Sequence, residues 1–93
     1  MRLTQKEIAA IRETILDIDG AAEIYLFGSR ADDRRRGGDI DLLIASDRMT
    51  AADRRKIRLR LYDRLGAQKI DIVLARNASE AFVRIAKEEG VRL

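Results

Sequence analysis

The chain has 93 residues, of which 46% are hydrophobic and 38% are charged, and this length predicts one small domain spanning residues 1–93. It contains no Cys and no His, which excludes a disulfide scaffold, a thiolate zinc site and a His general base. The 19 basic residues nearly balance the 16 acidic ones, so the net charge of +3 is weak support for a nucleic-acid partner. Any metal site must be built from oxygen ligands.

Apolar periodicity divides the chain into three helices and three strands. The helices are expected at residues 4–19, 51–65 and 77–89, and the strands at residues 23–27, 39–45 and 69–75. Residues 32–38 show no periodicity and are expected to form a loop. The order helix, strand, loop, strand, helix, strand, helix predicts an α/β (α+β) fold, in which one three-stranded sheet packs against helices.

Capping patterns mark where the predicted helices begin and end. The expected pairs of cap residues are Thr4 with Glu7, Thr50 with Asp53 and Asn77 with Glu80. Each helix is followed by a glycine that can end it, since glycine readily leaves the helical conformation. The residues expected to be buried in the last two helices are Ile57, Leu61, Leu65, Phe82, Ile85 and Ala86.

Three aspartates fall in the two most apolar predicted strands, although Asp is disfavoured inside strands. Asp39 and Asp41 are two residues apart, so their side chains point to the same face, while Ile40 points to the helix layer. In the third strand, the side chain of Asp71 points to the opposite face from those of Ile70 and its apolar neighbours. If these strands are adjacent, the three carboxylates converge on one patch.

Three clustered carboxylates repel one another, so at least one pKa should rise unless a cation is present. With only oxygen ligands available, Mg²⁺ is the natural cation. The Asp-x-Asp spacing of Asp39 and Asp41 can place carboxylate oxygens on two metal ions, and Asp71 can orient and deprotonate an attacking hydroxyl. This is the two-metal arrangement used for displacement at phosphorus. Alternatively, these aspartates flank an exposed edge and form ion pairs with neighbouring arginines.

The dipeptide Gly28-Ser29 follows the first strand. Glycine allows a tight turn and a close approach of the backbone to a ligand, and Ser29 offers a hydroxyl and an N–H to a phosphate. Arg30 is a further candidate phosphate contact. The alternative is an ordinary turn at the end of a strand. The arginines at 34–36 belong to a solvated loop, form an anion clamp over the site or contact an acidic partner.

The motifs at residues 26–31 (LFGSRA) and 39–44 (DIDLLI), with the later strand at 69–73 (KIDIV), resemble the DNA polymerase beta-like nucleotidyltransferase superfamily. Within it, the chain is similar to minimal nucleotidyltransferase domains, which occur as antitoxins beside toxins of the HEPN fold. The resemblance implies a small mixed sheet flanked by helices. It also implies transfer of a nucleoside monophosphate from an NTP to a hydroxyl, with release of pyrophosphate.

The resemblance implies a role for each site residue. Asp39, Asp41 and Asp71 would be catalytic and would hold two Mg²⁺ ions, while Gly28, Ser29 and Arg30 would bind the nucleotide. In the antitoxin branch the donor is ATP and the acceptor is a tyrosine of the HEPN-type toxin. The chain is thus expected to be an adenylyltransferase that modifies a partner protein.

Two other functions are compatible with the sequence. One is a binding module that neutralises its partner by occlusion without catalysis. The other, which has weaker support, is a small basic nucleic-acid-binding domain, since two Phe, two Tyr and no Trp leave few side chains for stacking on bases. No apolar run is long enough to span a membrane, and Met1 is followed by a polar helical pattern. We therefore expect a cytoplasmic protein without a membrane partner.

Overall fold

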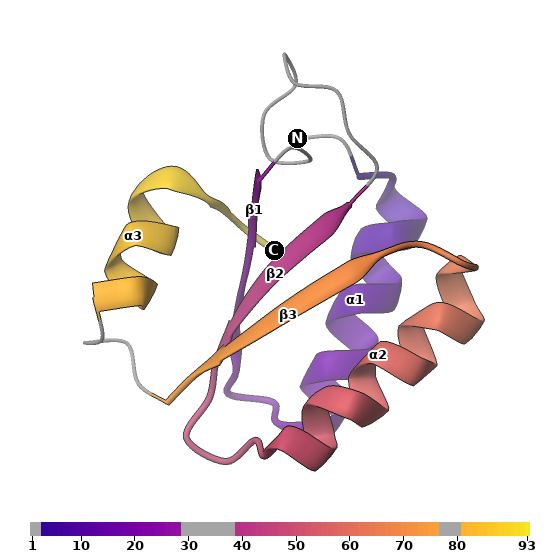
Figure 1. Cartoon of the computed structure of the whole chain (residues 1–93), viewed down its shortest axis with the longest axis horizontal. Coiled ribbons are helices and arrows are strands. Elements are labelled where there is room, and N and C mark those ends of the chain that lie inside the picture. Colours follow the sequence, from indigo (N-terminus) through magenta and orange to yellow (C-terminus); the bar gives the residue numbers. More distant parts are fainter. Residues whose placement is uncertain (1–2, 29–38, 77–80) are drawn as a thin grey trace.

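The computed structural model describes residues 3–28, 39–76 and 81–93. Its elements are α1 (Gln5–Ile18), β1 (Glu23–Phe27), β2 (Ile40–Ala45), α2 (Ala51–Leu65), β3 (Ile70–Ala75), α3 (Ala81–Glu89) and β4 (Val91–Arg92) (Figure 1). The three helices and the first three strands confirm the predicted order. The proposed cap between Asn77 and Glu80 lies outside the described residues.

The first two helices begin as their capping patterns predict. In α1 the Thr4 hydroxyl accepts the Glu7 N–H, and the Glu7 carboxylate accepts the Thr4 N–H. Thr50 and Asp53 form the same reciprocal pair at the start of α2. Each capping box satisfies two backbone N–H groups that the first helical turn would otherwise leave without a partner. Gly66, at a φ of +83°, ends α2.

The strands form one mixed sheet of four strands in the order β3-β2-β1-β4. Strands β2 and β3 are parallel, and β1 is antiparallel to both β2 and β4. The prediction of a three-stranded sheet was therefore wrong. The two-residue strand β4 is too short to produce an alternating pattern, and only its pairing with Tyr25 and Leu26 of β1 defines it.

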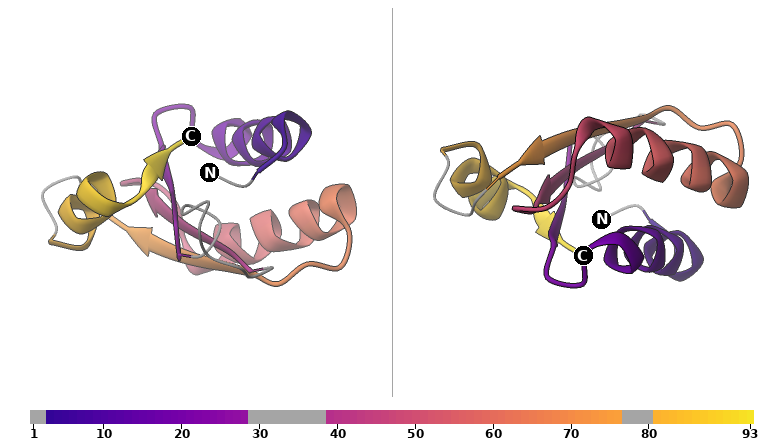
Figure 2. Two further views of the ribbon diagram at one scale, coloured as in Figure 1. Left: turned by 90° about the horizontal axis from the view of Figure 1, so that it is seen from above. Right: turned by 90° about the horizontal axis from the view of Figure 1, so that it is seen from below.

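Helices α1 and α2 cover one face of the sheet, and α3 lies on the opposite face (Figure 2). Alternation along β2 supplies both layers: Ile40, Leu42 and Ile44 face the α1–α2 layer, whereas Leu43 and Ala45 face the α3 side. The strand is therefore apolar at almost every position, as expected for a central strand buried on both faces.

The predicted burial of α3 requires one correction. Val83 and Ala86 are buried against the sheet, whereas Ile85 is 54% exposed, so its predicted burial was wrong. The side chain of Phe82 lies outside the description. Val83 and Ala86, three residues apart, form the line of α3 that packs on the sheet, and Ile85 lies off this line. After α3, Gly90 leads directly into β4, which pairs with β1. A Cβ on Gly90 would lie 2.8 Å from the Leu26 carbonyl oxygen, so this close passage requires glycine.

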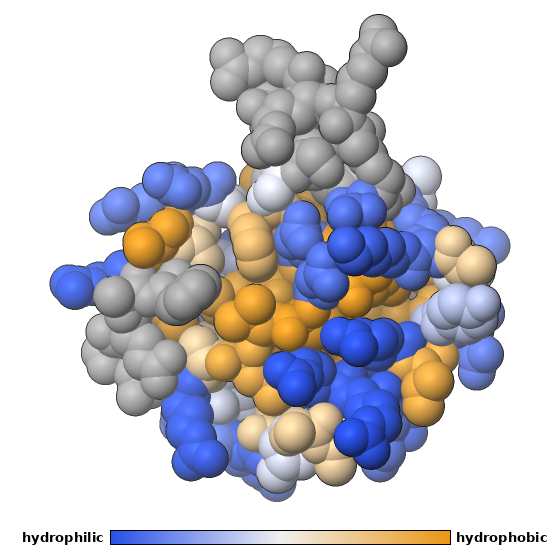
Figure 3. All heavy atoms as spheres, in the orientation of Figure 1, coloured by the Kyte–Doolittle hydropathy of each residue, from blue (hydrophilic) through white to orange (hydrophobic). Residues whose placement is uncertain are grey.

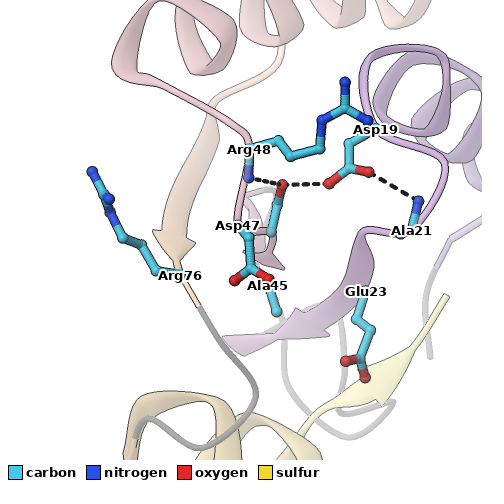
Figure 4. A pocket seen from close by; sticks show the side chains of 8 residues that line it. Asp19, Ala21, Glu23, Ala45, Asp47, Arg48 and Arg76 are labelled. Carbon is cyan, nitrogen blue, oxygen red and sulfur yellow. Dashed lines mark hydrogen bonds between the residues drawn. The ribbon is translucent and has the colours of Figure 1, made fainter.

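The turn between α1 and β1 is fixed by Asp19, which is almost fully buried. The Ser46 hydroxyl donates to one Asp19 carboxylate oxygen at 2.5 Å, and the Ala21 N–H donates to the other at 3.0 Å (Figure 4). These hydrogen bonds lower the pKa of Asp19. Asp19 therefore ties α1 to the carboxyl end of β2. It lines a pocket of about 260 Å³ there, together with Glu23, Arg48 and others.

Among residues 3–28, 39–76 and 81–93, no helix is long and apolar enough to cross a membrane.

Candidate active site

The three aspartates lie at the end of the sheet where β2 and β3 begin. Asp41 and Asp71 are direct partners in the parallel register of these strands. Asp39 immediately precedes β2, and Ile40, between the two β2 aspartates, is fully buried in the α1–α2 layer. The structure therefore brings the three carboxylates together on the face that carries α3, as the alternation predicts.

Burial and the proximity of the other two carboxylates raise the pKa of Asp41. Burial is the largest cause, and the negative charges of Asp71 and Asp39 add to it. The Asp71 carboxyl is also within hydrogen-bond reach of Asp41. A carboxylate that is partly buried beside two others is unstable in its charged form unless a cation is near. The predicted rise in the pKa of one carboxyl is thus confirmed for Asp41.

Lys69 supplies the compensating charge. Its ammonium nitrogen lies 3.7 Å from an oxygen of Asp39 and 4.0 Å from an oxygen of Asp71. In the described part of the chain, no arginine pairs with these carboxylates, so the arginine pairing considered from the sequence is not found there. All three side chains of this ion pair are at least half exposed, so the pairing is weak.

Gly28 lies directly against Asp41. Its φ is +77°, which side chains other than glycine rarely adopt. A Cβ built on Gly28 would collide with a carboxylate oxygen of Asp41 and would lie 3.2 Å from the carboxyl carbon. The turn after β1 therefore comes as close to Asp41 as backbone can, and only glycine permits it. The predicted site residues Ser29 and Arg30 lie outside the described residues.

The chemistry of this donor set fits a divalent cation. Asp39, Asp41 and Asp71 offer only carboxylate oxygens, and oxygen is the ligand that Mg²⁺ prefers. Lys69 supplies one positive charge beside these three carboxylates. Within the described residues, however, no group of three acidic side chains is already arranged as a closed metal centre. The strand register places Asp41 opposite Asp71, with Asp39 just before β2, so the carboxylates share one patch without forming such a centre.

Lys69 was not singled out from the sequence, although the pattern contained a usable clue. It precedes Asp71 by two residues in an extended segment, so both side chains leave the backbone on the same side.

A groove of about 320 Å³ beside Asp71 was also missed. Its lining includes Arg58 and Tyr62 of α2 and Lys69 and Asp71 at β3. No local pattern could reveal it, because it depends on how α2 packs beside β3.

The sheet face beyond the aspartates is apolar. Phe27 pairs with Asp41 in the sheet, Leu43 follows Asp41 by two residues, and Val73 follows Asp71 by two. Phe27 and Val73 are only partly buried. In Figure 3 hydrophobic side chains gather over the middle of the sheet, with hydrophilic residues around them. The carboxylates therefore stand at the edge of a hydrophobic surface, where water screens electrostatic interactions less.

Comparison with known families agrees with this geometry. A family model described as Polymerase beta, Nucleotidyltransferase matches residues 7–93. No curated protein matches the chain. The match covers every strand of the sheet and all three aspartates, and the mixed sheet flanked by helices is consistent with the fold of that family. The chain therefore belongs to the polymerase beta nucleotidyltransferase family, whose members transfer nucleotidyl groups.

Proposed function

We propose that this protein transfers AMP from ATP to a hydroxyl group of a partner protein in a Mg²⁺-dependent reaction. The observation that carries the proposal is the register of Asp41 opposite Asp71, with Asp39 beside them and the backbone of Gly28 against Asp41. Membership of a nucleotidyltransferase family supports transfer of a nucleotidyl group in general. The donor, the metal and the acceptor are the specific parts of the proposal.

Each residue has a separate part in the proposed reaction. Asp39, Asp41 and Asp71 would hold two Mg²⁺ ions, which would neutralise the carboxylates and the triphosphate and polarise the reacting phosphate. Gly28, with Ser29 and Arg30, would bind the triphosphate, because a glycine turn exposes backbone N–H groups to phosphate oxygens. The hydrophobic surface that includes Phe27 and Val73 would lie beside the bound nucleotide.

The proposed step is a displacement at the α-phosphorus of ATP. The acceptor oxygen forms a bond to that phosphorus, the bond to the oxygen bridging the α- and β-phosphates breaks, and pyrophosphate leaves with the electron pair. The proton of the acceptor hydroxyl passes to a carboxylate oxygen of Asp71. Asp71 suits this part because its side chain is half exposed and lies beside the open groove.

The proposed acceptor is a tyrosine of a HEPN-fold toxin, which would make the chain the antitoxin of the pair and place it in the cytoplasm. The resemblance of residues 26–31 and 39–44 to minimal nucleotidyltransferases supports this assignment. Modification of a toxin tyrosine would neutralise the toxin covalently. Neutralisation that is equally effective with Asp39→Ala and Asp71→Ala would instead favour a non-catalytic binding module.

The donor and the metal can be tested by calorimetric titration of ATP into the protein with Mg²⁺ or with EDTA. We expect binding with Mg²⁺ and at least about tenfold weaker binding with EDTA or after Asp41→Asn, since this substitution removes a charge from the site. Asp47→Asn is the matched control, because Asp47 is an exposed aspartate just beyond the other end of β2. Equal affinity in all four titrations would overturn the proposed site.

A further inference from the structure

One side of α2 presents a stripe of exposed side chains that the fold does not use. Arg55, Arg58, Leu59 and Tyr62 recur at intervals of three and four residues, so they lie along one line of the helix. Leu59 is 63% exposed and Tyr62 is 54% exposed. Single exposed apolar residues are common on proteins, but two neighbouring ones bordered by arginines resemble the centre of a protein interface.

The charges on α2 are divided between its two sides. On the side next to α1, Arg60 pairs with Asp17 at 3.3 Å and Arg64 pairs with Glu13 at 2.7 Å. In the stripe, neither Arg55 nor Arg58 has a carboxylate within ion-pair distance among the residues that the structure describes. The stripe is therefore a cationic surface without internal neutralisation, and it is complementary to negative charge.

The stripe leads to the candidate active site. Arg58 and Tyr62 line the groove of about 320 Å³ that also contains Lys69 and Asp71. Strand β3 is an edge strand of the sheet, so this groove opens at the side of the molecule. A chain that binds along the stripe can thus reach the carboxylate proposed to accept the hydroxyl proton.

We propose that this stripe and groove form the docking surface for an acidic segment of the acceptor protein. The inference rests on the proposed function, because it takes the acceptor to be a protein. Arg55 and Arg58 bind acidic side chains of the segment, Leu59 and Tyr62 pack against its apolar side chains, and the groove admits the acceptor side chain to Asp71. A nucleic-acid strand would match the arginines, but it would leave Leu59 without an apolar contact. Arg and Tyr are, moreover, the residues that most often dominate protein interfaces.

The test measures binding without catalysis. A fluorescent random copolymer of glutamate and tyrosine is titrated with the protein in EDTA and without nucleotide, and polarisation is followed. We expect the dissociation constant to rise about tenfold for Arg58→Glu and for Arg55→Glu, and severalfold for Leu59→Ala and Tyr62→Ala. Arg12→Glu, a charge reversal at an exposed arginine of α1, is the matched control and should have a much smaller effect. Thermal unfolding of each variant checks that it remains folded.

Several results would overturn the docking surface. One is an effect of Arg58→Glu and Arg55→Glu no larger than that of Arg12→Glu. Another is tighter binding of a single-stranded oligonucleotide through the same two arginines. A third is a dimer of the free protein that dissociates on Leu59→Asp, since the stripe would then bind a second copy of the chain. Failure of the docking surface can be distinguished from failure of the proposed function: normal binding of the copolymer without any transfer of AMP would refute only the transferase assignment.

Discussion

The carboxylate of Asp41 fills the space that a side chain on Gly28 would need. This contact joins the turn after β1 to the facing aspartates of β2 and β3, Asp41 and Asp71. The turn can approach the carboxylate only because residue 28 has no Cβ and adopts a positive φ. The backbone of Gly28 is thereby placed directly against the Asp41 carboxylate.

Substitution of Gly28 by alanine should therefore damage the site as well as the fold. Gly66→Ala is a matched control, since Gly66 also has a positive φ but would place its Cβ in open space. We expect Gly66→Ala to lower the free energy of unfolding by about 1–3 kcal/mol through backbone strain alone. Gly28→Ala should cost at least as much and should also weaken binding of Mg²⁺·ATP about tenfold or more. Unimpaired nucleotide binding by a folded Gly28→Ala protein would contradict the contact with Asp41.

Removing the charge of Asp41 should stabilise the metal-free protein. The raised pKa of Asp41 means that the folded state binds its proton more tightly than the unfolded state does. The ionised carboxylate therefore costs stability at neutral pH. This cost disappears as the pH falls through the raised pKa toward the ordinary value of about 4.

In EDTA at pH 7, we expect the melting temperature of Asp41→Asn to exceed that of the wild type by a few degrees. The difference should shrink as the pH is lowered to about 4. The measurement is thermal unfolding at a series of pH values. A wild-type protein more stable than Asp41→Asn at pH 7 would contradict the described electrostatics.

Mg²⁺ with a non-hydrolysable ATP analogue should raise the melting temperature of the wild type above that of Asp41→Asn. A ligand that binds only the folded state raises stability in proportion to the logarithm of its concentration, by about 2.7 kcal/mol at a hundred times its dissociation constant. We expect a rise in the wild-type melting temperature that grows with Mg²⁺ concentration and is largely lost in Asp39→Asn and Asp71→Asn. An equal rise in these variants would place the metal elsewhere.

At the opposite end of the sheet, Ser46→Ala should destabilise the fold without touching the site. The substitution removes the hydrogen bond to the buried Asp19 carboxylate and should cost about 1–3 kcal/mol at pH 7 in urea unfolding. The pKa of Asp19 is lower in the folded state than in the unfolded state. The ionised carboxylate therefore stabilises the fold at pH values above the ordinary pKa of an aspartate, and this stabilisation is lost as the pH falls through the lowered pKa. The difference in the free energy of unfolding between Ser46→Ala and wild type should thus narrow in acid. Asp47→Ala, at the exposed neighbour, should have little effect.

Much of the fold could be predicted because local patterns and tertiary packing agree. The capping boxes at Thr4 and Thr50 set the starts of α1 and α2, and apolar alternation defines β2 and β3. The convergence of Asp39, Asp41 and Asp71 followed from the alternation of side chains along each strand. In the parallel pair β2 and β3, residues in register point to the same face, which brings Asp41 and Asp71 together. Strand β4 could not be predicted, because two residues contain no period and its existence depends on β1.

The groove beside Asp71 shows where prediction from sequence stops. Arg58 and Tyr62 are separated from Lys69 in the chain and meet it only because α2 packs beside the edge strand β3. Lys69 itself was accessible from its two-residue offset to Asp71, but a lone lysine on an exposed segment has many ordinary explanations. The predicted burial of Ile85 was wrong because α3 packs on the sheet through Val83 and Ala86, and the sequence pattern does not reveal which side of the helix meets the sheet.

The most direct test of the central claim is transfer of label from ATP carrying a radioactive α-phosphate to a HEPN-fold partner protein. With Mg²⁺ the wild type should label a partner tyrosine and release pyrophosphate, and EDTA, Asp41→Asn or Asp71→Asn should reduce the rate by at least about a hundredfold. Asp47→Asn should transfer label at the wild-type rate. Absence of label on the partner, or equal labelling by Asp41→Asn, would contradict the account.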